Sequence, residues 1–547
     1  MKENFFRSMT WLHTWVGLLV CWLLFLIFFA GTISFFKDEI TYWFEPETHT
    51  VTHQDNRLAK QRQQINYAVE QLQNKAADSS SWRIYLPEPR NPLYTYSYAE
   101  PKQPGQRRAK FTETYLDPTT NEQIAPPRET KGGYFFYRLH FDLHYIDVRT
   151  ARWLVCLASL FMLIALITGV VIHKRIFKDM FSFRKNKGSR SWLDAHNVSS
   201  VLALPFHIMI TYTGLITLIF MVFPYPAQTV YEKGLQQMFN EASPIRARVE
   251  SSDVPAPLVS MNTILDQVYT KSPDADIGFF FIRDANKESS RVSVYLNTGK
   301  EVVDNGAAFL FSGSTGELLA EQGKDWSASA RFYDSMTALH AGRLASPLLR
   351  WLYFLCGIAG CAMIATGCIM WAKRLRERLK PQQQAGVGLK LVETLNLATL
   401  MGLPFATASF FIANRLLPLE MVARADKEIL VFFLAWLAMT VLAIISSSKR
   451  QWQLAAWLNA LVCFAVPLVN AMTTEGNWIS YLLTQKWTLF CVDFGFIIAG
   501  SLFILQGKKL RTASKKLRTA SKKVSTASKK VSTRRFQKPK DLKEQQG

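Results

Sequence analysis

Long apolar stretches alternate with polar segments along this chain. Stretches of the length that crosses a bilayer, about 20 residues, lie near 11–36, 152–173, 196–223, 348–371, 391–413, 429–447, 453–472 and 487–506. Window hydropathy of this kind predicts transmembrane helices, so we expect a polytopic α-helical membrane protein with about eight of them. The first stretch is long for a signal peptide and has no small-residue cleavage motif. We therefore expect it to remain as an anchor.

The two long polar segments, 37–150 and 224–347, each have the pattern of a small α+β unit. In the first segment a helical pattern, I-N-Y-A-V-E-Q-L-Q, precedes the strand-like runs W-R-I-Y-L-P and Y-T-Y-S-Y. In the second, M-N-T-I-L-D-Q-V-Y precedes I-G-F-F-F-I and V-S-V-Y-L-N. Apolar residues at helical spacing followed by short β-branched and aromatic runs favour this order of elements. We expect two small modules in tandem.

Aligned on histidines, residues 1 to about 375 contain two copies of one unit. Each copy begins with a histidine that opens an apolar helix, has a glycine eighteen residues later, and continues through a polar segment to a Leu-His pair and a second apolar helix with a Thr-Gly step. The corresponding positions are His13 and His196, Gly31 and Gly214, Leu139-His140 and Leu339-His340, and Thr168-Gly169 and Thr366-Gly367. Repetition at this scale predicts two equivalent halves.

Orientation follows from lysine and arginine in the short loops. The 174–190 stretch holds seven of them and the 373–380 stretch holds five. The positive-inside rule places these loops in the cytoplasm. We therefore expect both termini and the 174–195 loop to be cytoplasmic, and the two polar modules to face outward. In a bacterium this arrangement corresponds to an inner-membrane protein with periplasmic modules.

Charge and cysteine content narrow the function. The chain carries a net charge of +22, but residues 508–547 alone hold fifteen Lys or Arg against two acidic residues in a repeat of the form L-R-T-A-S-K-K. We expect this tail to be a mostly disordered basic arm near anionic membrane lipid, with no nucleic acid as partner. All seven cysteines fall inside apolar stretches. A disulfide framework or an iron–sulfur site is therefore not expected.

The order of histidine-led helices around two modules resembles the PepSY-associated transmembrane helix family. The resemblance covers about residues 1–375 and rests on R-S-M-T-W-L-H-T-W-V-G, L-H-F-D-L, D-A-H-N-V-S-S-V-L-A-L-P-F, Y-T-G and L-H-A-G-R-L. Within that family the chain looks most like the di-haem ferric-siderophore reductases. The resemblance implies a b-type haem protein, with two haems, that passes electrons across the inner membrane to a periplasmic ferric siderophore or other ferric chelate. The four helices of 391–506 are a histidine-free extension beyond this pattern.

The histidines support haem binding independently of the resemblance. A membrane b-type haem is held by imidazoles from different helices. Seven of the nine histidines lie in or at the first four apolar stretches, and none follows position 340. The seven candidates are His13, His140, His144, His173, His196, His207 and His340. If the two copies are related by an axis normal to the membrane, His13 meets His196 at the inner side.

The outer ligands are less determined by the sequence. His140 and His340 form the symmetric pair, and His207, deeper in the membrane, is an alternative ligand. We expect the axial ligands of the haem irons to come from His13, His196, His140, His340 and His207. His173 and His144 have no histidine at the equivalent position of the other copy and are weaker candidates for cofactor binding. No catalytic residue beyond the haems is expected.

Two other classes of function remain open from the sequence. No nicotinamide or flavin fingerprint is present, so an electron-transfer protein would need a separate donor, a cytoplasmic flavoprotein or a membrane quinol. A non-enzymatic anchor whose modules regulate periplasmic proteases would tolerate loss of the membrane histidines. A transporter of iron chelate or haem would move its substrate without electron input. Asp493, an acid within the last apolar stretch, is a candidate for a proton path or for simple packing.

Overall fold

The structure is a computed structural model. It consists of two compact units. The described residues are 2–51, 57–88, 90–104, 106, 109–173, 184, 187–243, 245, 251–297, 307–323, 328–343, 345–380, 383–445 and 448–535. One unit comprises Met1–Glu377 with Pro418–Asp426, and the other comprises Arg378–Leu417 with Lys427–Gly547. Most of the 174–195 loop lies outside the described residues.

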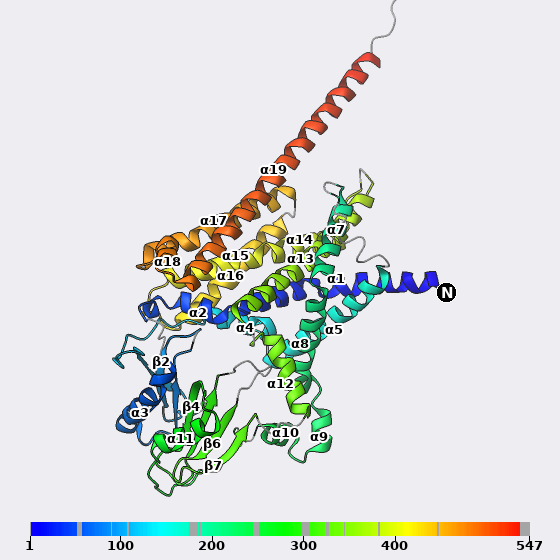
Figure 1. The fold of residues 1–547 in the computed structure, drawn as a ribbon. Helices are drawn as coiled ribbons and strands as arrows, with labels where there is room; N and C mark the ends of the chain where they lie inside the picture. The colour runs from blue at the N-terminus through cyan, green and yellow to red at the C-terminus, as the bar shows by residue number, and fades with distance from the viewer. Residues whose placement is uncertain are drawn as a thin grey trace, which may run out of the picture. The chain divides into compact units, whose positions relative to one another are not determined.

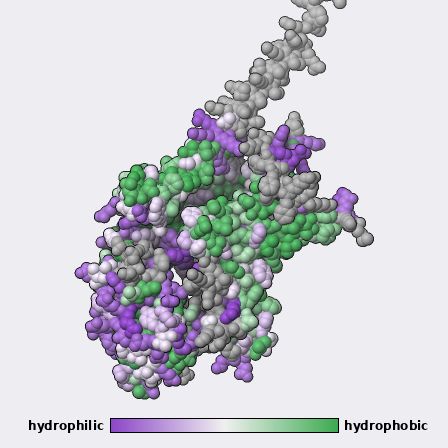
Figure 2. All heavy atoms as spheres, in the orientation of Figure 1, coloured by the Kyte–Doolittle hydropathy of each residue, from purple (hydrophilic) through white to green (hydrophobic). Residues whose placement is uncertain are grey.

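Eight helical spans in the described chain are long and apolar enough to cross a membrane, which confirms the expected number (Figure 1). Four belong to the first unit: α1 (Lys2–Ser34), α5 (Val148–Ile172), α8 (Leu204–Val222) and α13 (Pro347–Arg378). The other four are α14 (Val387–Leu400) together with α15 (Gly402–Leu416), then α16 (Arg424–Ile445), α17 (Lys449–Thr473) and α19 (Trp487–Arg535). Figure 2 shows hydrophobic residues gathered over these long helices and hydrophilic residues over the sheet.

The span expected at 196–223 is not one continuous helix. It is divided into α7 (Ser189–Leu202) and α8, with a break at Ala203, whose φ of −112° and ψ of 20° are not helical. Pro205 lies in the first turn of α8. A proline has no amide hydrogen and its ring clashes with the preceding turn, so it begins a helix more easily than it continues one. His196 and His207 therefore lie on different helices.

The basic tail was predicted to be mostly disordered, and this is wrong for most of its described length. The helix α19 continues to Arg535. Between residues 508 and 535 the sequence contains neither glycine nor proline, and twelve of these residues are lysine or arginine. These residues have good helix propensity, and nothing in this stretch breaks the helix.

The two polar segments share one sheet, whereas the sequence predicted two small separate modules. Seven antiparallel strands lie in the order β3-β2-β1-β4-β5-β6-β7. Their bounds are β1 (Ser81–Tyr85), β2 (Tyr94–Ala99), β3 (Phe111–Leu116), β4 (Ile277–Arg283), β5 (Arg291–Leu296), β6 (Ala308–Ser312) and β7 (Leu318–Gln322). The two segments join where β1 pairs with β4, with Trp82 opposite Ile282. This pairing satisfies an edge strand of each segment that would otherwise have open hydrogen-bonding groups.

One hydrophobic core serves both segments. The helices α3 (Arg57–Ala76) and α11 (Met261–Lys271) contribute Leu72 and Leu265 to the same buried cluster as Trp82, Ile84 and Phe280 from the strands. Alternate strand residues point into this core. The opposite face of the sheet carries the remaining residues.

Short helices connect the sheet to the spans. They are α2 (Lys37–Phe44), η1 (Pro46–Thr48), α4 (Gly132–Asp142), α9 (Tyr225–Val230), α10 (Gly234–Ala242) and α12 (Ala328–Ala341), and α18 (Trp478–Leu483) precedes the last span of the second unit. The Leu-His pairs lie in the last turns of α4 and α12. The helix α4 packs against α1, and α12 packs against α8.

Candidate functional site

The structure places His13 of α1 beside His196 of α7. Their ring centroids are 6.3 Å apart and their planes cross at 70°. The Nδ1 atom of His13 lies 2.9 Å from the carbonyl oxygen of Ala165 on α5. The Nδ1 atom of His196 lies 2.8 Å from the carbonyl oxygen of Met363 on α13. Each ring is thus fixed by the second span of its own repeat copy.

A second pair forms between His140 of α4 and His340 of α12. Their ring centroids are 5.9 Å apart and their planes differ by 31°. His140 Nδ1 lies 2.7 Å from the carbonyl oxygen of Ile27 on α1. His340 Nδ1 lies 3.0 Å from the carbonyl oxygen of Ile210 on α8. In this pair each ring is fixed by the first span of its own copy.

Each of the four imidazoles packs against a glycine that marks the sequence repeat. A Cβ atom on the glycine would lie 2.7 Å from His140 at Gly31, 2.8 Å from His340 at Gly214, 3.2 Å from His13 at Gly169 and 3.3 Å from His196 at Gly367. In a close-packed interior, an added methyl group would force a shift at Gly31 and Gly214 and would displace the ring by a few tenths of an ångström at Gly169 and Gly367. The repeated glycines therefore provide the space in which the rings lie.

The hydrogen bonds define the tautomer of all four histidines. A carbonyl oxygen only accepts, so each Nδ1 carries the hydrogen and donates it. The neutral ring then presents Nε2 as a lone-pair donor, which is the arrangement of metal-binding histidines. None of the four Nε2 atoms has a hydrogen-bond partner among the residues that the structure describes. Burial lowers the pKa of His140 and, with His140 nearby, lowers the pKa of His340 to about 3, so both rings are neutral.

These pairs fit the axial positions of a haem iron. Two imidazoles bound through Nε2 on opposite sides of one iron, with metal–nitrogen bonds of about 2 Å, have ring centroids about 6 Å apart. The distances of 6.3 Å and 5.9 Å match this separation. No group of three or more His, Cys, Asp or Glu suited to a metal ion occurs within the described ranges. Paired imidazoles are thus the metal-binding arrangement that the described residues offer.

The two pairs lie at different depths. His13 and Ile27, whose carbonyl oxygen contacts His140, are fourteen residues apart on α1. At 1.5 Å per residue this is about 20 Å along the helix. One pair therefore lies near each end of the first span.

Comparison with known proteins covers the part of the chain that holds both pairs. The model of the PepSY-associated TM region family matches residues 10–374. The chain belongs to this family. An uncharacterized protein of Pseudomonas aeruginosa, PA4219, is 22% identical over 376 residues, which are 64% of this chain and 89% of that relative. The helices of the second unit lie outside the PepSY-associated match.

His207 lies within the PepSY-associated region but does not join either pair. Its ring is fully buried and contacts Phe28 and Phe206, each with centroids 6.1 Å away. Its Nε2 atom lies 3.3 Å from the carbonyl oxygen of Cys356. Ligation by His207 remains a prediction, because the pairs already contain two imidazoles each.

The two weaker candidates also lie apart from the pairs. His173 follows α5 and its Nε2 lies 3.0 Å from Nδ2 of Asn197. His144 lies in a turn where Leu143, His144 and Tyr145 all have positive φ, and its ring contacts Phe135 with centroids 5.9 Å apart. Neither ring contacts one of the four paired imidazoles in the described structure.

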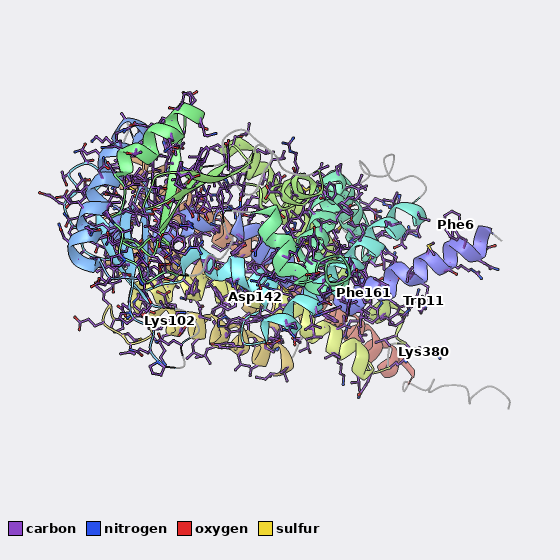
Figure 3. All side chains as sticks on the ribbon, turned by 90° about the horizontal axis from the view of Figure 1, so that it is seen from below. Phe6, Trp11, Lys102, Asp142, Phe161 and Lys380 are labelled. Atoms are coloured by element: carbon purple, nitrogen blue, oxygen red, sulfur yellow. The ribbon has the colours of Figure 1, made fainter. Side chains whose placement is uncertain are left out.

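Sequence reasoning missed a carboxylate that holds α4 in place. Asp142, labelled in Figure 3, lies at the end of α4, two residues after His140, and is buried. It forms ion pairs with Arg138 of α4 and Arg152 of α5, the latter at 2.7 Å. The motif L-H-F-D-L contains this aspartate, but no signal in one sequence tells that an arginine ten residues later is its partner.

The second unit contains a buried polar network that includes Asp493. Asn470 of α17 donates to Asp493 at 3.0 Å and accepts from Arg415 Nε at 2.9 Å. Asn414 of α15 donates to Glu428 of α16 at 2.8 Å. All these side chains are buried. Asp493 is therefore held by an amide donor within a network, which neither of the two sequence interpretations described.

Proposed function

We propose that this protein is an inner-membrane b-type haem protein that passes electrons across the membrane and reduces a ferric chelate at the outward side. The observation that carries the proposal is the presence of two imidazole pairs. All four rings are fixed through Nδ1, and the ring centroids within each pair are about as far apart as those of two histidines on one haem iron. Haem bound at the two pairs would supply one-electron chemistry, because a six-coordinate iron with two histidines favours outer-sphere transfer.

The residues of the chain set the conditions for that transfer. Ala165, Met363, Ile27 and Ile210 hold the imidazoles in fixed orientations through their carbonyl oxygens. Fixed ligands reduce the rearrangement that accompanies a change of charge at the site. The four glycines leave space for the four rings against the helix backbones of their own copies.

The direction of electron flow follows from topology. The His13–His196 pair lies at the end of the spans next to the basic loops, which the positive-inside rule places in the cytoplasm. The His140–His340 pair lies on α4 and α12, the helices that follow the strands of the two polar segments along the chain. Electrons from a cytoplasmic flavoprotein or a membrane quinol would enter at the first pair and leave at the second. Each electron converts one chelated Fe³⁺ to Fe²⁺, which the chelator then releases.

A stopped-flow reoxidation experiment tests this function. Detergent-purified protein is reduced with dithionite that supplies one electron per haem, so that no free reductant remains, and is mixed with a ferric chelate in the presence of a ferrous-specific chromophore. The proposal predicts that reoxidation of the haem bands and appearance of Fe²⁺ share one rate, with one Fe²⁺ formed per electron. Stable reduced bands in excess ferric chelate would contradict the reductase function while leaving haem binding intact.

A further inference from the structure

The sheet face opposite α3 and α11 is rich in aromatic residues and arginines, which have no role in the proposed transfer of electrons between the histidine pairs. Its central rungs run across β1, β4 and β5. One rung is Tyr85, Phe279 and Tyr295, and the next contains Arg83, Phe281 and Ser293. A third rung pairs Arg283 with Arg291. We call this surface the arginine–aromatic face.

The aromatic rings of this face lie in a stacked row. Tyr85 and Phe279 have centroids 4.5 Å apart at 22°, and Phe279 and Tyr295 have centroids 5.5 Å apart at 28°. Tyr85 is 42% exposed. Flat, near-parallel rings with an open end offer a stacking surface to a planar aromatic group.

The arginines of this face lack carboxylate partners. Arg283 and Arg291 lie directly opposite each other on β4 and β5, and like charges in this position destabilise a sheet. Within the described chain, neither forms an ion pair, and the Nε atom of each is buried without a hydrogen-bond partner. Arg83 lies over the ring of Phe111 at 3.5 Å and near Phe281 at 5.8 Å, also without an ion pair among the described residues.

Two serine hydroxyls of this face are also buried without partners. Ser97 and Ser293 lie on the Arg83 rung, each is 1% exposed, and neither Oγ has a hydrogen-bond partner in the described structure. The acid nearest in register, Glu113 on β3, accepts from its neighbour Tyr115. Unsatisfied buried donors are rare in folded proteins. On these rungs of the described sheet, three arginines therefore lie against one carboxylate, that of Glu113.

The aromatic rung lies at the end of the sheet that is tied to the first span. Five residues after Tyr85, Arg90 donates to Glu39 of α2 and to the carbonyl oxygen of Phe35. Glu39 also accepts from Arg350 of α13. A molecule on the Tyr85 rung would therefore lie near the end of the sheet that Arg90 connects to α2 and, through Glu39, to α13.

We propose that the arginine–aromatic face binds the ferric chelate and selects chelates that are both aromatic and anionic. This inference rests on the proposed function, because it specifies the substrate class of the same reductase. The stacked row would take planar rings of the chelator, and the arginines would take its negative oxygens, since guanidinium groups bind such oxygens in charge-assisted hydrogen bonds. A tris-catecholate complex of a trivalent metal has both properties, whereas an aliphatic hydroxamate complex has neither.

Binding of redox-inert gallium complexes tests the inference separately from electron transfer. Full-length protein in detergent is titrated with gallium tris(2,3-dihydroxybenzoate) and with neutral gallium tris(acetohydroxamate), and the dissociation constants are measured by calorimetry. We expect the catecholate to bind at least tenfold more tightly, with an affinity that falls as salt is added. Because Ga³⁺ accepts no electron under these conditions, failure of the reductase function does not affect this result.

Matched variants locate the site. The double variant Arg283→Gln with Arg291→Gln should weaken catecholate binding at least tenfold, and Tyr85→Ala should weaken it severalfold. The control is Arg62→Gln, because Arg62 lies on α3 at the opposite face and pairs with Asp266 at 2.7 Å. Equal affinity for the two gallium complexes, or unchanged catecholate affinity in the double variant, would overturn the inference. The double variant removes a like-charge pair, so it should fold, and its melting temperature checks this directly.

Discussion

The glycine that contacts each imidazole can be replaced by alanine to test whether the position of the ring depends on the missing side chain. At Gly31 a Cβ atom would lie 2.7 Å from Nδ1 and 2.8 Å from Cε1 of His140. Restoring an ordinary contact of 3.4 Å requires the ring to retreat by about 0.7 Å. The Nδ1 hydrogen bond to Ile27, now 2.7 Å, would then reach about 3.4 Å, beyond the normal range of N–H···O bonds.

The Gly31→Ala variant should lose the haem proposed at the His140–His340 pair. Loss of the partner that orients a metal-binding histidine typically lowers metal affinity by about 10- to 100-fold. We expect Gly31→Ala to bind haem at the His13–His196 pair and to lose most of it at the His140–His340 pair during purification. Gly17→Ala is the control on the same helix, because nothing lies within 4 Å of a Cβ there. The assay is pyridine haemochrome quantification per chain, and full haem content in Gly31→Ala would refute the reasoning.

Three further predictions concern the sheet and its connections. Burial and the carboxylates of Glu47 and Glu113 raise the pKa of Glu45 to about 7 from 4.5, so the folded state keeps a proton that the unfolded chain releases. Stability from this group is therefore present below about pH 4.5 and is lost as the pH rises through about 7. Chemical unfolding monitored from pH 4 to 8 should show a decline of roughly 1–3 kcal/mol that Glu45→Gln removes. Asp142→Asn should weaken the hold of α4 on α5 and reduce occupancy of the His140–His340 pair while its partner pair stays occupied, as measured by reduced-minus-oxidised spectra; equal loss at both pairs would contradict this. Trp82→Ala should cost about 3–5 kcal/mol and expose both halves of the sheet to proteolysis together, because the halves share one core; cleavage confined to residues 57–116 would contradict a common core.

The spans and the pairing of His13 with His196 were predictable from the sequence because both depend on simple regularities, whereas the sequence left the outer pairing open among His140, His340 and His207. Hydropathy alone determines which stretches can cross a bilayer, and all eight expected spans are present. The pairing of His13 with His196 followed from the repeat, because equivalent residues of two copies approach a common axis. The glycines were visible as repeat markers, but their contact with the rings was not.

The remaining features depend on contacts between residues distant in sequence. The pairing of Trp82 with Ile282 joins segments two hundred residues apart, and no local pattern distinguishes two closed modules from one shared sheet. Pro205 is a residue that commonly begins a helix, which agrees with the break at Ala203. The apolar residues on both sides nevertheless predicted one continuous span. The cross-strand position of Arg283 and Arg291 depends on register, which the turn between β4 and β5 sets.

The haem content of the purified protein and of two histidine variants tests the central claim most directly. Reduced-minus-oxidised spectra with pyridine haemochrome quantification should give b-type bands and about two haems per chain in the wild type. His13→Ala and His340→Ala should each retain about one, and His173→Ala should retain two. A colourless wild-type protein from haem-replete cells, or two haems in both His13→Ala and His340→Ala, would contradict the assignment of the two pairs.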